Sequence, residues 1–338
     1  HHRDSLRCVE AMDIRVDQRG SLFVVTLGLV MILGALAVTI ARLLSTEVRL
    51  ARYRLAQAQA KTLARSGVYL AMQRLAQDGQ DEAERYDWLR DDWACFPDED
   101  PQRPTVWLVE SRMEEDGVPS GIIEIQIVDE ERKLPLNLVR SEATDPWFTA
   151  LSELLGSPTH ARRIADALDQ DTVPFGIGGM EEDTTAEPPY VAKNGALVVH
   201  EELLDIPGLA EAFNTVQRYT STAPLSGRLN LNTVEPSVLQ ALGMRLATAQ
   251  ALEACRQQGI IFTEDATILD MADTCVGPGG LSETERGLLV NTFGVVSQMF
   301  TVISTGRLEH PVVSIRVEAL IQRSPDTQAP PRILSWKE

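Results

Sequence analysis

The sequence predicts an α+β protein whose long N-terminal helix crosses a membrane and then packs on an antiparallel sheet. Three observations support this fold class. Residues 21–41 carry no charge and are numerous enough to span a bilayer. Apolar and polar residues alternate near the middle and at the end of the chain, as in strands with one buried face. Between these regions, helix-start signals predict a large inserted helical domain.

The uncharged stretch is SLFVVTLGLVMILGALAVTIA, a run of 21 residues. As a helix with a rise of ~1.5 Å per residue it is roughly 30 Å long, the thickness of the hydrocarbon core of a bilayer. Signal-peptide cores are shorter, about 7–15 residues, and no small-residue cleavage site follows this run. We therefore expect a retained transmembrane helix over 21–43, with a buried helix of a soluble core as the alternative. Arginines flank the run on both sides, so their distribution does not orient it.

The helix is predicted to continue beyond the membrane. Residues 43–77 contain no proline and only one glycine, Gly67. Apolar residues recur there in steps of four and three, at Leu44, Val48, Ala51, Leu55 and Ala58. One continuous helix over about 22–77 would be roughly 80 Å long. Its amphipathic second half must bury its apolar face on the same chain or on neighbouring subunits.

Five strands are predicted in two regions of the chain. Two lie near the middle and three near the end, at 107–109, 123–127, 300–304, 313–319 and 333–336. Their alternating pattern suits one antiparallel sheet, with one face on the long helix and the other in water. Residues 137–295 are mostly helical by pattern, with helix starts at Asp145-Pro146 and Ser157-Pro158. The segment 136–138, Leu-Asn-Leu, is echoed at 229–233, Leu-Asn-Leu-Asn-Thr, which suggests two related helical units.

The chain contains four cysteines, Cys8, Cys95, Cys255 and Cys275, and none is spaced as a zinc knuckle or a redox pair. In an oxidising compartment, Cys255 and Cys275 are the pair expected to form a disulfide, since it closes a short local loop. Two buried free thiols are the alternative. Cys95 would have no partner.

Composition argues against nucleic acid as a partner. The formal net charge of the 338 residues is -18, whereas phosphate binding needs lysine and arginine. Ile206-Pro207-Gly208 has the form of a DNA-binding helical hairpin. It lies, however, in the segment 166–211, which contains eleven acidic residues and one lysine, Lys193. No nucleophile motif and no metal spacing of histidines occurs, so we predict no catalytic site.

An acidic, glycine-rich loop is the candidate metal site. Asp169 and Asp171 precede the turn 176–179, and Glu181 and Glu182 follow it. Carboxylates that converge on such a turn suit calcium, which takes six to eight oxygen ligands. The spacing is not that of an EF-hand. The alternative is a solvated acidic loop without an ion.

Several phrases resemble a known family. Arg19-Gly20 before the apolar run looks like the end of a type IV prepilin leader, which is cleaved after the glycine, here between Gly20 and Ser21. The fifth residue after that point is glutamate in major pilins and is Val25 here. This departure, the segment LLSTEVRLARYRLAQAQAKTLARSGVYLAMQRL, and the phrases RLNLNT and EELLDIPGL resemble the K-type minor pseudopilin of the type II secretion system.

The resemblance implies an architecture. Expected segments are a leader over 1–20, a transmembrane helix over 21–43, a pilin-like domain over 44–135 completed by strands over 296–338, and an inserted helical domain over 136–295. The resemblance also implies calcium binding, because members of that family bind calcium in their inserted helical domain.

The resemblance also implies a location and partners. The chain would be a single-pass protein of the bacterial inner membrane, with its bulk in the periplasm. It would assemble at the pseudopilus tip with the I-type and J-type minor pseudopilins and with inner-membrane secretion components. The alternatives are a minor pilin of a type IV pilus and a membrane-anchored periplasmic enzyme or solute-binding protein.

Overall fold

A computed structural model describes residues 18–78, 86–94, 107–111, 121–324 and 329–338. Residues 1–17, which hold most of the predicted leader and Cys8, lie outside the described residues, as does Cys95. The chain divides into two compact units, residues 1–56 and 57–338. The second unit contains the predicted pilin-like strands and the predicted inserted domain.

Helix α1 (Gln18–Asp78) is a single helix of 61 residues, and it confirms the prediction of one continuous helix. In the first unit its apolar side chains are exposed from Leu22 onward, which suits a helix made for surroundings other than water. Its length and composition are sufficient to cross a membrane.

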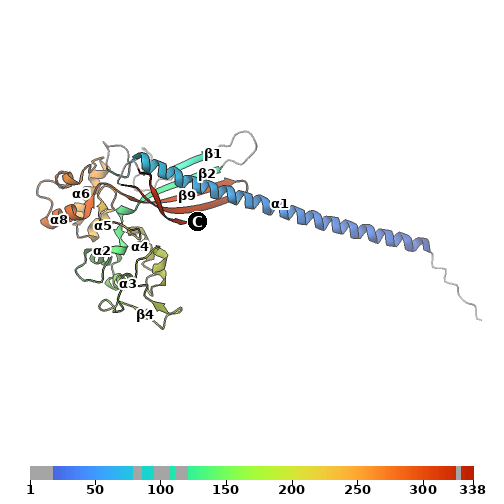
Figure 1. Ribbon diagram of the computed structural model, residues 1–338, viewed down its shortest axis with the longest axis horizontal. Coiled ribbons are helices and arrows are strands. Elements are labelled where there is room, and N and C mark those ends of the chain that lie inside the picture. The colour runs from blue at the N-terminus through green and yellow to red at the C-terminus, as the bar shows by residue number, and fades with distance from the viewer. Residues whose placement is uncertain (1–17, 79–85, 95–106, 112–120, 325–328) are drawn as a thin grey trace, which may run out of the picture. The chain divides into compact units, whose positions relative to one another are not determined.

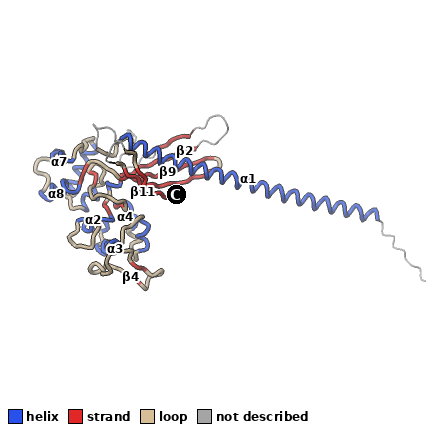
Figure 2. The backbone as a smooth tube through the Cα atoms, viewed as in Figure 1, coloured by secondary structure: helices blue, strands red, loops and turns tan. Residues whose placement is uncertain are grey.

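The five predicted strands form one antiparallel sheet, coloured red in Figure 2, and confirm the predicted α+β class. The strands lie in the order β1-β2-β9-β10-β11, and their bounds are β1 Trp107–Ser111, β2 Gly121–Asp129, β9 Met299–Glu309, β10 Val312–Gln322 and β11 Arg332–Lys337. In the centre of the sheet Ile125 pairs with Ser304, and Val302 pairs with Ala319. Within the described residues, the shorter helices all lie between β2 and β9.

The second half of α1 runs along one face of this sheet (Figure 1). Residues on the inward face of β2, such as Ile123 and Ile125, are buried with Val68 and Leu75 of the helix. The helix can approach the sheet closely because the strand residue at the point of contact is a glycine, which has no side chain. A Cβ atom at Gly306 would lie 2.1 Å from the carbonyl oxygen of Ala60, so only glycine fits there.

Residues 130–298 fold into short helices, 3-10 turns and pairs of two-residue strands. The α-helices are α2 Pro146–Leu155, α3 Pro158–Leu168, α4 Phe213–Tyr219, α5 Pro236–Ala241, α6 Leu246–Gln257, α7 Ile268–Val276 and α8 Glu283–Thr292. The 3-10 turns are η1 Glu130–Arg132, η2 Leu136–Leu138, η3 His200–Asp205 and η4 Asp265–Thr267. The two predicted helix starts are confirmed. Asp145 accepts a hydrogen bond from Phe148 N at 2.9 Å, and Ser157 accepts one from His160 N at 3.3 Å.

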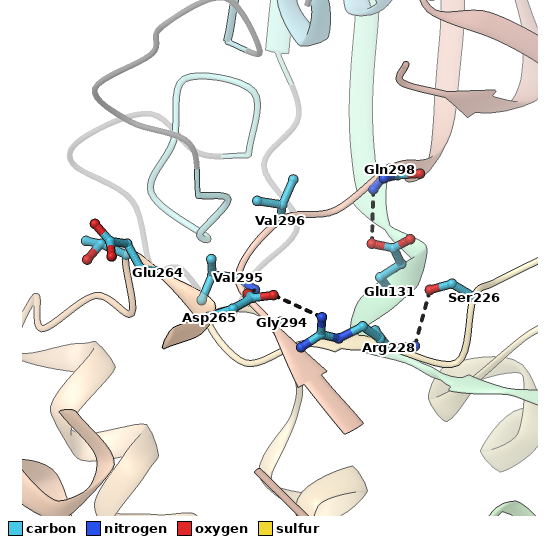
Figure 3. A pocket seen from close by; sticks show the side chains of 10 residues that line it. Glu131, Ser226, Arg228, Glu264, Asp265, Gly294, Val295, Val296 and Gln298 are labelled. Atoms are coloured by element: carbon cyan, nitrogen blue, oxygen red, sulfur yellow. Dashed lines mark hydrogen bonds and ion pairs between the residues drawn. The ribbon is translucent and has the colours of Figure 1, made fainter. Parts of the chain in front are cut away.

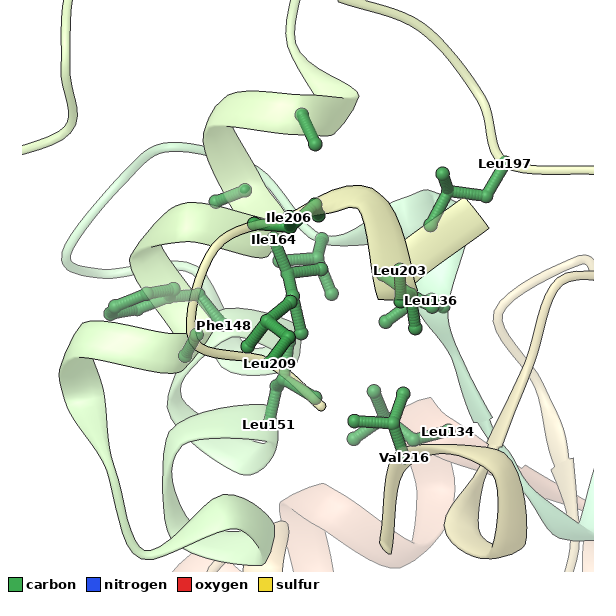
Figure 4. Close-up of a cluster of buried hydrophobic side chains, with 14 of the residues drawn as sticks. Leu134, Leu136, Phe148, Leu151, Ile164, Leu197, Leu203, Ile206, Leu209 and Val216 are labelled. Atoms are coloured by element: carbon green, nitrogen blue, oxygen red, sulfur yellow. The ribbon is translucent and has the colours of Figure 1, made fainter. Parts of the chain in front are cut away.

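The helical region has two hydrophobic cores, which define two lobes. The first lobe, residues 134–221, is built around the cluster in Figure 4, which gathers side chains such as Leu151, Ile164 and Leu203. The second lobe, residues 229–295, packs around a separate cluster that includes Leu252 and Phe293.

The two lobes repeat one arrangement of strands. In the first, β3 (Leu134–Pro135) pairs in parallel with β6 (Thr220–Ser221); in the second, β7 (Leu229–Asn230) pairs in parallel with β8 (Phe293–Gly294). Each lobe is thus closed by pairing its first residues with its last. A third pair, β4 (Glu182–Asp183) with β5 (Tyr190–Val191), is antiparallel and belongs to the first lobe alone.

An asparagine near the start of each lobe has the same role. The side-chain amide of Asn137 bonds both backbone groups of Leu197, at 2.8 and 2.9 Å. The side-chain amide of Asn232 bonds both backbone groups of Phe262, at 2.9 and 2.8 Å. These matching contacts agree with the internal repeat that the sequence suggests.

The lobes and the sheet share buried polar contacts. Thr233 donates its hydroxyl to Asp129 at the end of β2, at 2.6 Å. Asn230 donates its amide to the hydroxyl of Ser297, just before β9, at 2.8 Å. These bonds join the start of the second lobe to the two strands that flank the helical region, which explains why the region is not a separate compact unit.

Candidate metal centre

The acidic loop after α3 is shaped by a buried aspartate, Asp166. This residue is fully buried on α3, and its two carboxylate oxygens accept hydrogen bonds from Phe175 N at 2.8 Å and Met180 N at 2.5 Å. Arg162 of the same helix donates to the carbonyl of Ile177 at 2.7 Å. The Phe175 ring packs edge-on against Phe148 of the first core, with ring centroids 5.0 Å apart. The loop is therefore folded back onto α3.

Three carboxylates converge under this loop. Oxygen atoms of Asp166, Asp169 and Glu181 all lie within 4.8 Å of one another. The hydroxyl of Ser141 donates to Asp169, and so does Asp171 N at 3.3 Å. Glu181 is only 8% exposed, and neither of its carboxylate oxygens has a hydrogen-bond partner among the described residues.

Two further oxygens near this loop are buried without a partner among the described residues, the Tyr190 hydroxyl and Asn194 Oδ1. The β4–β5 pairing places Tyr190 opposite Asp183 and Val191 opposite Glu182. Because side chains alternate along a strand, Tyr190 is buried while Val191 is exposed. Ala192 N donates to the Glu181 carbonyl at 2.7 Å and continues the pairing.

The raised pKa values of these groups indicate that too little positive charge lies near their oxygens. Burial, followed by the charges of Asp166, Asp169 and Asp171, raises the pKa of Glu181 to about 7. Burial also raises the pKa of Asp166, although backbone N–H groups oppose the shift. Burial and the charge of Glu181 raise the pKa of Tyr190 to about 12. A hard cation with oxygen ligands would remove this imbalance.

The structure brings together two of the four residues predicted as ligands, Asp169 and Glu181. Asp171 is exposed, and its carboxylate accepts from Val173 N at 2.7 Å within a turn. Glu182 is exposed on β4 and is not in the cluster, because neighbouring residues of a strand point to opposite sides.

Sequence reasoning did not assign Asp166 as a ligand. The available signal was its spacing from Asp169, since residues three apart lie on one side of a helix. Its burial and its contacts with the loop depend on the fold and not on local sequence.

The other predicted site residues lie apart from this cluster. A disulfide joins Cys255 of α6 to Cys275 of α7, with Cα atoms 5.7 Å apart. Gly20 and Ser21 lie in the first turn of α1, and their side chains are outside the described residues. Cleavage between them stays a prediction.

A pocket of about 460 Å³ lies between the second lobe and the start of β9 (Figure 3). Its polar side chains already serve the fold. Arg228 pairs with Asp265 at 3.0 Å and donates to the carbonyl of Phe293 at 2.6 Å. Glu131 accepts from Gln298 N at 3.0 Å. The contacts of Arg228 join the two ends of the second lobe, and that of Glu131 joins η1 to the residue before β9.

No protein-family model and no curated protein matches the sequence. A solved structure does match the fold: a chain from "The Crystal Structure of the GspK-GspI-GspJ complex from enterotoxigenic Escherichia coli Type 2 Secretion System". The match has a TM-score of 0.64 at 18% sequence identity and covers 85% of this chain and 98% of that one. Nearly all of the solved chain is therefore represented in this protein, which shares its fold.

Proposed function

We propose that the protein is a K-type minor pseudopilin, a subunit that assembles with I-type and J-type pseudopilins at the tip of a type II secretion pseudopilus. The observation that carries this proposal is the fold match to a chain of the GspK-GspI-GspJ complex over 98% of that chain. The resemblance of the N-terminal residues to a prepilin supports it too, because α1 contains an apolar run long enough to cross a membrane. On this proposal the role is assembly rather than catalysis.

The N-terminal helix would hold the subunit in the bacterial inner membrane with the lobes in the periplasm. Cleavage between Gly20 and Ser21 would leave the apolar run as the mature N-terminus. Val25 suits a first subunit, because a buried carboxylate at that position needs a charged partner from the subunit ahead. N-terminal sequencing of the purified protein tests this step, and a mature chain that begins elsewhere than at Ser21 would contradict it.

We also propose that calcium binds at Asp166, Asp169 and Glu181. The two oxygens of Glu181 that lack partners support this ligand set, which replaces Asp171 and Glu182 with Asp166. Calcium takes oxygen ligands in flexible geometry, so backbone carbonyls or water would complete the shell. The ion would hold the acidic loop against the first lobe and so fix the conformation of the surface that this loop forms.

The experiment for the proposed function is co-purification. The full chain is expressed in membranes with the I-type and J-type pseudopilins of the same secretion system and is captured by a tag. We expect the three subunits to be recovered together in equal amounts, and deletion of the gene to abolish secretion. Recovery of the tagged chain alone, with secretion intact in the deletion strain, would contradict the proposal.

A further inference from the structure

A second group of carboxylates lies at the C-terminal end of α1, away from the acidic loop. Asp78 is the last residue of α1, and Asp87 and Asp91 lie in the described segment that follows, 86–94. Oxygen atoms of these three residues all lie within 4.8 Å of one another. They come from parts of the chain that meet where the helix, the sheet and the second lobe join.

Protein donors occupy one oxygen of each carboxylate. Asp78 Oδ2 pairs with Arg323 Nη1 at 2.8 Å. Asp87 Oδ2 pairs with Nη2 of the same arginine and accepts from Ser297 N at 2.7 Å. Asp91 Oδ2 accepts from Trp88 N at 2.9 Å and from Trp93 Nε1 at 3.1 Å. The three side chains are thus fixed in place by contacts that leave their second oxygens available.

One of the second oxygens, that of Asp87, is buried and has no donor among the described residues. Asp87 is 1% exposed, and its Oδ1 is buried without a hydrogen-bond partner. A buried carboxylate oxygen without a partner is unfavourable, so a fold that keeps one needs another occupant beside it.

The local charge favours a cation as that occupant. Among the described residues Arg323 pairs with two of these three carboxylates, Asp78 and Asp87. Two other buried acids, Asp129 and Glu131, are close enough to Asp87 for its charge to raise the pKa of each. One guanidinium therefore leaves a net negative charge in a buried region, where opposite charges attract strongly.

We propose that Asp78, Asp87 and Asp91 form a second divalent-cation site, with one carboxylate oxygen of each as a ligand. A hard cation such as calcium fits an all-oxygen set of this kind. It would fasten the end of α1 to the segment 86–94 and, through Arg323, to the end of β10. The proposal depends neither on the acidic loop nor on the proposed function, and the competing occupant is a proton.

The test uses terbium, a luminescent ion that takes the same ligands as calcium, on the full chain in detergent. The Asp169→Asn/Glu181→Gln variant removes the ion at the acidic loop. In that background, excitation of tryptophan should give terbium emission, because Trp93 contacts Asp91, and calcium should displace one ion per chain. Adding Asp91→Asn should weaken binding roughly tenfold or more. The asparagine oxygen can still accept from both tryptophan N–H groups, so the packing is retained.

The matched control is Asp92→Asn. The Asp92 side chain is 70% exposed and pairs with Arg74, so its loss should leave ion binding unchanged. Calorimetry with calcium on the Asp169→Asn/Glu181→Gln chain gives a second reading that does not need the Asp91 variant to fold. If that chain binds no calcium, the occupant is a proton and the proposal is wrong. Equal affinity with and without Asp91→Asn would overturn it too.

Discussion

Each of the two lobes buries one glutamate, and the pKa values of the two glutamates are shifted in opposite directions. In the second lobe Glu285 is 1% exposed and accepts from Arg245 Nε at 3.0 Å and from Ser282 N at 2.8 Å. Burial opposes its ionisation, but the hydrogen bonds from Arg245 and Ser282 hold its pKa well below the ordinary value. In the first lobe Glu181 has no donor among the described residues, and burial raises its pKa to about 7.

The difference shows that burial alone does not decide whether a carboxylate is ionised. The donors that surround it decide the sign of the pKa shift. The second lobe supplies its own cation, Arg245, and adds the Cys255–Cys275 disulfide. The first lobe supplies no such partner to Glu181, and we propose that it binds calcium there instead. Four changes would break or sharpen this contrast.

The largest effect is expected from the disulfide. Reduction, or replacement of Cys255 and Cys275 by alanine, should lower the free energy of unfolding by about 3 kcal/mol, because an open loop of this length is less restricted in the unfolded chain. Denaturant unfolding of oxidised and reduced protein measures it. Reducing agent should have no further effect on the double alanine variant. Equal stability of oxidised and reduced protein would show that the second lobe does not depend on the bond.

The next effect concerns Glu285→Gln, which leaves Arg245 with a neutral partner. At pH 7 the variant should be less stable by about 2 kcal/mol, since a charge-assisted set of hydrogen bonds is lost. Because folding lowers the Glu285 pKa, its contribution is present above the unfolded pKa and disappears as pH falls. The difference between variant and wild type should therefore stay constant in thermal melts from pH 7 to about pH 5 and shrink progressively below the unfolded pKa of 4.5. A difference that does not change with pH would contradict the account.

The corresponding change in the first lobe, Glu181→Gln, should reverse its sign with calcium. In chelator the variant should be more stable by about 1 kcal/mol, because a buried charge without a partner is removed. In excess calcium the variant should be less stable than the wild type, because the substitution removes a calcium ligand. Melting curves of both proteins in both conditions measure the reversal. Glu182→Gln is the matched control and should have no effect in either condition, since Glu182 is exposed.

The smallest effect, about 1 kcal/mol each, is expected from Asn137→Ala and Asn232→Ala. Each variant removes the amide that bonds both backbone groups of one residue, Leu197 or Phe262. Similar losses of unfolding free energy in denaturant titrations would support the repeat. A loss at only one of the two would show that the repeated contact has different weight in the two lobes.

Much of the fold could be predicted from local sequence, since its signals are periodic. The apolar run and the absence of proline over 43–77 predict α1, and alternation predicts the five strands of the sheet. The two-residue strand pairs such as β3–β6 could not be predicted, because an alternating pattern cannot be recognised in only two residues. Their partners lie far apart in the sequence and are set by the closure of each lobe.

The candidate site was predicted only in outline. The density of acidic residues around 176–179 indicated the loop, but not which carboxylates turn inward. Asp166 is buried because α3 packs its apolar face on the first core, and Glu182 is exposed because β4 alternates. The group at Asp78, Asp87 and Asp91 gave no signal at all, because Arg323 and Ser297 reach it from more than 200 positions along the chain.

The contrast between the lobes is tested most directly by amide hydrogen exchange on the full chain, with and without calcium. The account predicts that calcium slows exchange over 169–195, where the acidic loop and β4–β5 lie, and leaves exchange over 246–276 unchanged. Protection that is the same in calcium and in chelator over 169–195 would contradict the claim that the first lobe closes on an ion.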